Sequence, residues 1–171
     1  MTWNDYFLTL FDSCCATYRA GARDFEKFYT GEDRAFLATI GYQPREFFDF
    51  VEDFCNDGVP SASTALLVAA VRRDYFLTVQ HGVTSPNLLT HDELPNFGQT
   101  LGGLAYLPRI LAKARAKLRG ELDPDLMFGC GGDRNFLQKH GEIHPADFLR
   151  RVWASGGDDR KLAAWVAKQG G

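Results

Sequence analysis

Apolar residues recur at three- and four-residue steps along most of the chain, and this helical period constrains the fold more than any other feature. The clearest case is the stretch 44–57. Pro44 suits a first helical position, and Gly58 stands where a left-handed cap would end the helix. One face between them carries Phe47, Phe48, Val51, Phe54 and Cys55. The spacing therefore predicts an amphipathic helix whose opposite face is acidic.

Comparable patterns extend over the rest of the chain. They predict helices over residues 2–20, 31–40, 61–79, 107–119, 134–140, 145–155 and 159–169. We expect Ser61 or Ser63 to cap the helix 61–79, Asp133 to cap the helix 134–140, and His144 and Asp158 to open the last two helices. No alternation typical of strands and no hairpin dipeptide stands out. The prediction is an all-α fold of about seven helices.

One long irregular stretch, residues 82–103, interrupts the helical pattern and holds two prolines and four glycines. Loops of this length inside a compact domain are uncommon and often functional, although a plain connector is an equal alternative. We predict a single helical domain over 1–171, with an N-terminal half (1–95) and a C-terminal half (100–171).

Composition narrows the class of protein. A chain of 171 residues with 45% hydrophobic content suffices for one core, and a net charge of −3 argues against a polycation that seeks nucleic acid. No apolar run approaches the roughly 18 residues of a membrane span, and the first residues lack the pattern of a signal peptide. We therefore expect a cytoplasmic protein with no membrane contact.

The four cysteines contain no Cys-x-x-Cys pair, so their spacing fits no zinc signature. Free thiols are expected in the absence of an export signal. We expect Cys14, Cys15 and Cys55 to be small buried hydrophobes.

The stretch 107–120 packs five cations into fourteen positions. At 100° per residue, Arg109, Lys113 and Lys117 line one flank of the apolar arc. Arg115 and Arg119 line the other. The leading interpretation is a set of cations that are solvated or paired within the protein. An anion site, in which Arg109 and Arg115 hold a carboxylate or phosphate, is the next alternative, and nucleic-acid binding the weakest.

Two sequence blocks, "LGGLAYLPRILAKARAKLRG" and "FGCGGDRNFL", occur in order in this region. They resemble the uncharacterised bacterial domain-of-unknown-function family 5069 over about residues 100–155. The residues that carry the resemblance are Gly102, Gly103, Leu107, Pro108, Arg109, Lys113, Arg115, Cys130, Asp133, Phe136 and Leu137. The resemblance implies no activity, because none is known for the family.

Cys130 lies in the glycine-rich segment "GCGGD", directly before a predicted helix. Backbone N–H groups in such a segment can stabilise a thiolate and a developing oxyanion. His81 and His140 are candidate bases for this thiol. The alternative is a structural cysteine beside an N-capping Asp133.

Asp74 and the pair of His140 and His144 are further candidate residues. Asp74 falls on the apolar arc that runs through Leu67, which predicts a buried carboxylate that either pairs with a core-rim arginine or tyrosine or acts as a general base. His140 and His144 are four residues apart, but Gly141 separates their helices, so no metal site is predicted.

These observations favour a small-molecule enzyme or binding protein for an anionic metabolite. Arg109, Lys113, Arg115 and Tyr106 would bind the anion. Cys130 or Asp133 would act on it, and His81 or Asp74 would move protons. The sequence specifies no cofactor and leaves the reaction open. The alternative is a helical interaction or scaffold domain without catalysis.

Overall fold

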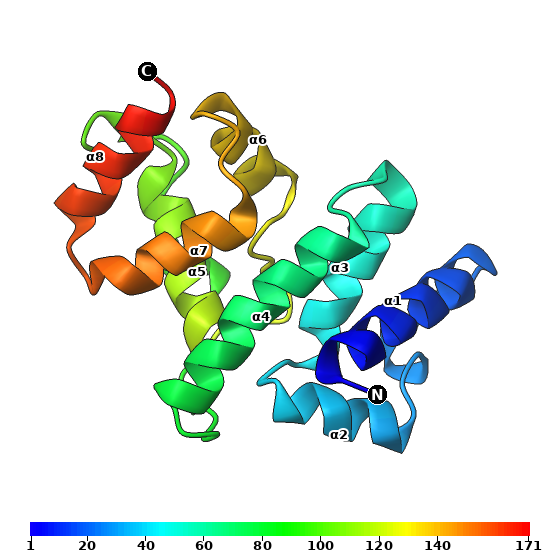
Figure 1. Cartoon of the computed structure of the whole chain (residues 1–171). Helices are drawn as coiled ribbons and strands as arrows, with labels where there is room; N and C mark the ends of the chain where they lie inside the picture. Colours follow the sequence, from blue (N-terminus) through cyan, green and yellow to red (C-terminus); the bar gives the residue numbers. More distant parts are fainter. The chain divides into compact units, whose positions relative to one another are not determined.

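The computed structural model describes residues 1–171, and its regular secondary structure is almost entirely helical, which confirms the predicted all-α class (Figure 1). The helices are α1 (Trp3–Arg19), α2 (Gly31–Thr39), α3 (Pro44–Asp57), α4 (Ala62–Thr78), α5 (Leu107–Arg119), α6 (Gly131–Lys139), α7 (Pro145–Ser155) and α8 (Asp159–Gln169). Two short 3₁₀ helices, η1 (Phe25–Lys27) and η2 (His91–Glu93), lie in connecting segments. No helix is long and apolar enough to cross a membrane.

The chain forms two compact units, Met1–Thr84 and Ser85–Gly171, called here the first and second unit. The boundary falls inside the irregular stretch 82–103. In the first unit α1 packs against α3 and α4. Aromatic side chains fill this core, and Phe7 meets Phe47 edge to face with ring centroids 4.9 Å apart.

The ends of α3 and α4 follow the predicted capping residues. Pro44 occupies the first turn of α3, and Gly58 closes the helix in the left-handed conformation, with φ 74°. Ser61 accepts a hydrogen bond from the backbone N–H of Thr64 and so caps α4. Local capping chemistry therefore sets both boundaries.

The prediction that Asp74 is buried is wrong. The face that α4 buries comprises Ala65, Val68, Ala69, Val71, Arg72 and Phe76. Asp74 points elsewhere: its side chain is 61% exposed and lies 3.5 Å from Arg73. The predicted arc was centred on Leu67, which is itself 41% exposed. The continuous apolar run at the start of α4 does not specify which side faces the core.

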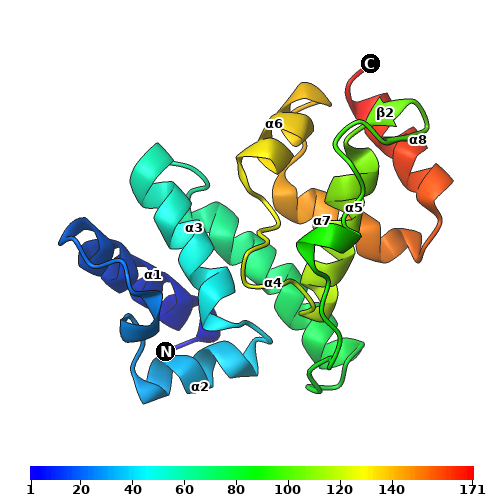
Figure 2. The same ribbon diagram turned by 180° about the vertical axis from the view of Figure 1, so that it is seen from behind.

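In the second unit α5 packs against α7, and α7 against α8. A two-stranded hairpin, β1 (Thr100–Leu101) and β2 (Leu104–Ala105), contacts α5 and α8 through β1 and is visible beside α8 in Figure 2. This hairpin is not predicted from the sequence, because two-residue strands are too short to show alternation. Its signal was the dipeptide Gly102–Gly103, whose φ angles of 58° and 79° suit a hairpin turn.

Glycine at position 102 is also required by packing. A Cβ atom there would lie 2.9 Å from the Cβ of Ala163 in α8. The hairpin turn thus rests directly on α8, immediately before the chain enters α5.

Candidate functional site

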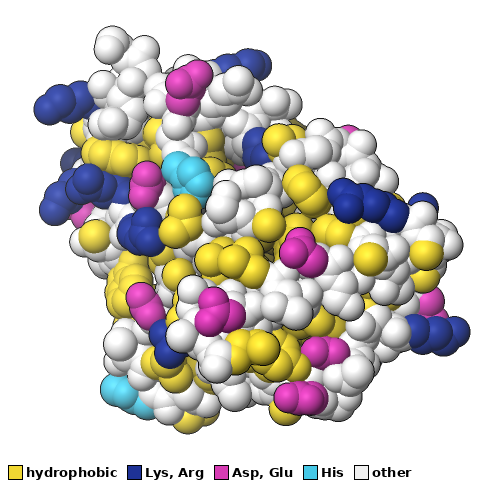
Figure 3. Space-filling model, turned by 45° about the vertical axis from the view of Figure 1, so that its right-hand side comes forward, with side chains coloured by type: hydrophobic (Ala, Val, Ile, Leu, Met, Phe, Trp, Pro, Cys, Tyr) yellow, Lys and Arg dark blue, Asp and Glu magenta, His cyan; other side chains and the backbone are white.

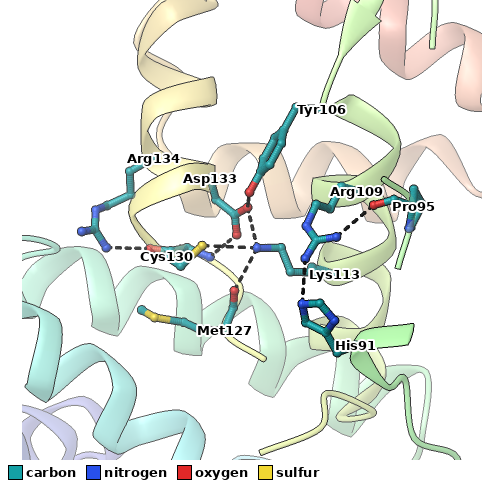
Figure 4. A network of polar contacts seen from close by, with 10 residues as sticks. His91, Pro95, Tyr106, Arg109, Lys113, Met127, Cys130, Asp133 and Arg134 are labelled. Carbon is teal, nitrogen blue, oxygen red and sulfur yellow. Dashed lines mark hydrogen bonds and ion pairs between the residues drawn. The ribbon is translucent and has the colours of Figure 1, made fainter. Parts of the chain in front are cut away.

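A network of polar contacts in the second unit joins α5 to the segment that leads into α6 (Figure 4). Its central residues are Tyr106, Lys113, Cys130 and Asp133. All four were sequence-predicted site residues, and the structure brings them together.

The centre of the network is a buried ion pair. Lys113 Nζ lies 2.6 Å from Asp133 Oδ1, and the two side chains are only 5% and 0% exposed. A buried pair of this kind persists only if the remaining hydrogen-bonding capacity of both groups is satisfied. Lys113 also donates to the carbonyl of Met127 at 3.2 Å, and Asp133 Oδ2 accepts from the backbone N–H of Gly129 at 2.9 Å.

Asp133 does not cap the helix that follows it, and that prediction is wrong. Cys130 holds the N-cap position, α6 begins at Gly131, and Asp133 lies within the first turn. Its carboxylate turns toward Lys113 and the Gly129 N–H instead of the helix start. The ion pair therefore ties the loop before α6 to the middle of α5.

Tyr106 completes the pair from above, as seen in Figure 4. Its hydroxyl donates to Asp133 Oδ1 at 2.8 Å. Burial, followed by the neighbouring negative charge of Asp133, raises the pKa of Tyr106, so the phenol stays a proton donor. Tyr106 itself adopts φ 73°, a backbone conformation rare for residues other than glycine, at the start of α5.

Cys130 is only half-buried, as is Tyr106, whereas Lys113 and Asp133 are buried. Lys113 Nζ lies 3.3 Å from Cys130 Sγ, at hydrogen-bonding distance. The next two residues, Gly131 and Gly132, are exposed. The first N–H groups of an α-helix have no helical carbonyl to bind, and the Cys130 side chain makes no capping bond. A thiol, an ammonium group and backbone donors therefore lie together at the start of α6.

Arg109 lies one turn before Lys113 but serves a different contact. Its guanidinium donates to the carbonyl of Pro95 at 2.9 Å and lies 3.5 Å from His91 Nε2. It also covers the ring of Phe97, at 4.2 Å from the ring centroid. Arg109 thus fastens the loop 91–97 to α5.

Arg115 projects from another part of α5 and forms an ion pair with Asp159 at the start of α8. It has no contact with the Cys130 network in the structure. Arg109 and Arg115 are therefore each engaged with a different segment of the second unit.

The remaining predicted catalytic residues belong to the first unit. His81 follows α4, is exposed and has φ 53°, and Asp74 is exposed on α4. Neither residue is a member of the network around Cys130.

The histidines of "HGEIH" have structural positions. His140 Nδ1 lies 2.8 Å from the Phe136 carbonyl at the end of α6. His144 accepts from the backbone N–H of Ala146 and so opens α7, as predicted. No group of three or more His, Cys, Asp or Glu side chains is arranged to hold a metal ion.

Most of the cations of α5 are buried and not exposed to solvent. Arg109, Lys113 and Lys117 are all buried, so the prediction that the cations of this flank are solvated is wrong. The alternative, pairing within the protein, is confirmed for Lys113. Arg119, on the other flank, is exposed and pairs with Glu121 at 2.6 Å. On the face seen in Figure 3, Lys and Arg side chains stand in separate groups with hydrophobic and acidic side chains between them.

The other cysteines differ from Cys130. All four are free thiols, and Cys14 and Cys15 are buried, as predicted. Burial raises the pKa of each of these two thiols to about 12. Cys55 is only half-buried, which is less than expected.

Sequence reasoning missed the backbone partners of the network and the role of Gly132. A Cβ atom at Gly132 would lie 2.8 Å from the Tyr106 hydroxyl, so only glycine admits the phenol at this distance. Arg134 adds a further support, since it donates to the Gly129 carbonyl at 2.9 Å. The run of glycines around Cys130 was the only signal in the sequence for this close approach.

Residues 97–171 match the model of a family described as a domain of unknown function (DUF5069). The match confirms the resemblance inferred from the two sequence blocks and includes the four central residues of the network. Comparisons with curated proteins and with solved structures found no match.

Proposed function

We propose that the second unit acts on an anionic small molecule, a carboxylate or a phosphate, and that Cys130 is its reactive group. The observation that carries the proposal is the contact of Lys113 Nζ with Cys130 Sγ, 3.3 Å long, at the exposed start of α6. An ammonium group beside a thiol stabilises the thiolate, which is the nucleophilic form.

The start of α6 supplies the second element of the proposal. Exposed N–H groups at a helix N-terminus attract anions, because their hydrogens are unpaired and the helix dipole adds positive potential. Those of Gly131 and Gly132 would receive the charged group of the ligand or the charge that develops as the thiolate attacks.

Lys113, Asp133 and Tyr106 have positioning roles in this proposal. Asp133 is fully buried, so it cannot contact a ligand, but it fixes the ammonium of Lys113 beside the thiol. Tyr106 in turn holds the Asp133 carboxylate. Arg109 has an indirect role, because it anchors the loop 91–97.

We propose that the protein acts in a bacterial cell, as the family resemblance implies, and that its location is cytoplasmic. The four free thiols support this location, because reducing compartments keep cysteines unpaired. The reactive-thiol proposal also requires that Cys130 stay reduced.

The test is a thermal-shift screen of the full chain against carboxylate, phosphate and sulfate metabolites, run on wild type, Cys130→Ser and Cys55→Ser. A ligand at 100 times its dissociation constant stabilises the folded state by about 2.7 kcal/mol. We expect hits for wild type and Cys55→Ser, and retained binding without turnover or adduct formation for Cys130→Ser. The absence of any shift with all three proteins folded would contradict the anion site and favour the interaction-domain alternative.

A further inference from the structure

The contact between Lys113 and Cys130 places an amine nitrogen against the sulfur of a half-buried residue. Nζ and Sγ are 3.3 Å apart, and they come from two elements, the middle of α5 and the residue before α6. The ammonium is held in place from the other side by Asp133 and the Met127 carbonyl. The nitrogen therefore cannot swing away from the sulfur without breaking a buried ion pair.

We propose that Lys113 and Cys130 form an oxidative modification site, at which peroxide converts the pair into a covalent sulfur–nitrogen cross-link. The geometry of this pair is sufficient for the cross-link, whether or not the proposed anion ligand binds.

The chemistry balances in two steps. Hydrogen peroxide first oxidises the Cys130 thiol to a sulfenic acid, and one molecule of water is released. Asp133, 2.6 Å from Nζ, then accepts a proton from the Lys113 ammonium. The freed amine attacks the sulfenic sulfur, the S–O bond breaks, and the hydroxyl group leaves as water with the second proton lost from nitrogen. The product is a sulfenamide, Lys113 Nζ–H bonded to Cys130 Sγ.

Selectivity for Cys130 follows from the surroundings of the other thiols. Cys14 and Cys15 are buried in the first unit, and burial holds the pKa of each near 12, so little thiolate is present. The Cys55 thiol donates to the Cys15 carbonyl instead of contacting an amine. Cys130 alone combines partial exposure with an adjacent lysine nitrogen.

The cross-link would change the function of the site reversibly. It removes both the thiol and the charge of Lys113, and it fastens the start of α6 to α5. A thiol reductant restores both groups, since sulfenamides are reopened by thiols.

The experiment is peptide mapping of the full-length protein after treatment with hydrogen peroxide. Modified Lys113 resists trypsin, so the expected product links residues 110–115 to residues 120–134. Its mass is lower by two hydrogens, about 2 Da, than the sum of the two reduced peptides. Treatment with dithiothreitol should separate the pair and restore cleavage after Lys113.

Two variants serve as controls. Lys113→Arg keeps a cation beside Asp133 but lacks the amine, so the sulfenic acid should persist and be trapped by a cyclic 1,3-dione. Tyr106→Phe leaves both reacting atoms in place and should still cross-link. If Lys113→Arg does not fold, the wild-type peptide map alone decides.

Several results would overturn the proposal. These are sulfinic or sulfonic acid at Cys130 with Lys113 unmodified, a loss of two hydrogens confined to residues 120–134, a disulfide from Cys130, and a Cys130 that peroxide leaves unchanged. The second of these would indicate reaction with a backbone nitrogen instead of Lys113.

Discussion

Gly131 and Gly132 are adjacent at the start of α6, yet a side chain would meet different surroundings at each. A Cβ atom at Gly132 would lie 2.8 Å from the Tyr106 hydroxyl, whereas at Gly131 the nearest atom is the end of the Arg134 side chain at 3.8 Å. We expect Gly132→Ala to displace Tyr106 from Asp133 and to lower the free energy of unfolding by about 1–3 kcal/mol. Gly131→Ala should be neutral or stabilise by up to about 1 kcal/mol.

Urea unfolding of the two variants checks this difference. Each is the control for the other, because both replace an exposed glycine in the same helical turn. Equal effects on the free energy of unfolding would show that Tyr106 does not depend on the space at Gly132.

The phenol of Tyr106 offers a second prediction at this scale. Tyr106→Phe leaves the buried Asp133 carboxylate one hydrogen bond short, and we expect a loss of about 1–3 kcal/mol in the free energy of unfolding. Tyr6 makes a comparable bond to Asp33 at 2.9 Å, but Asp33 is only half-buried. Water can donate a hydrogen bond to Asp33 in place of that phenol, so Tyr6→Phe should lower the free energy of unfolding by less than Tyr106→Phe. A larger loss for Tyr6→Phe in urea unfolding would contradict the importance of burial.

The sequence indicates chemically unusual residues more readily than it indicates their partners. Cys130, Asp133 and Lys113 were all recognised as candidates, but Asp133 was expected to cap its own helix. The reason is that Lys113 lies 20 positions earlier in the chain. Helical periodicity describes the faces of one helix and contains no information on which loop packs against it.

At the scale of elements, Glu121 ties the start of the second unit to the end of α5. Its carboxylate accepts hydrogen bonds from Ser85 at 2.7 Å and Asn87 at 3.4 Å and pairs with Arg119 at 2.6 Å. Backbone bonds between Leu89 and the segment 121–123 reinforce the connection. The segment 85–89 of the irregular stretch is therefore ordered, because it is bound to the end of α5 and the residues that follow it.

The contacts of Glu121 predict that the free energy of unfolding depends on pH. Burial by itself would raise the pKa of Glu121, but the hydrogen bonds from Ser85, Arg119 and Asn87 outweigh burial, and the pKa is lowered from its ordinary value. A carboxyl whose pKa is lower in the folded state stabilises that state above the unfolded pKa of about 4.3. This stabilisation is lost as the pH falls through the folded pKa.

We expect Glu121→Gln to lower the free energy of unfolding at pH 7 by about 1–2 kcal/mol and to weaken its dependence on pH below 5. Urea unfolding at a series of pH values measures both effects. The exposed Glu142→Gln is the control and should leave the curve unchanged. If the free energy of unfolding falls equally with decreasing pH in wild type and Glu121→Gln, Glu121 does not contribute to this pH dependence.

The elements themselves were predictable wherever local chemistry sets them. Pro44, Gly58 and Ser61 mark helix boundaries that the structure confirms, because capping depends on nearby residues. The buried side of α4 was not predictable, since a run of consecutive apolar residues gives no single direction. The hairpin at 100–105 was too short for a strand pattern.

At the scale of the whole molecule, charge and thiols are unevenly distributed. The net charge is −3, and the most basic element, α5, directs three of its cations into buried positions. This arrangement does not favour a nucleic-acid surface, which requires exposed cations facing phosphates. Of these cations, Lys113 lies beside Cys130, within the part of the chain that matches the family model.

The central claim is that Lys113 makes Cys130 the reactive thiol of the chain. The direct test is limited alkylation of the native protein with iodoacetamide, with labelling at all four cysteines followed over time by mass spectrometry. We expect Cys130 to be labelled before Cys14, Cys15 and Cys55, and Lys113→Met to slow its labelling at neutral pH at least tenfold, a change of about 1.4 kcal/mol in activation free energy. Labelling of Cys55 ahead of Cys130, or an unchanged rate at Cys130 in a folded Lys113→Met variant, would contradict the account.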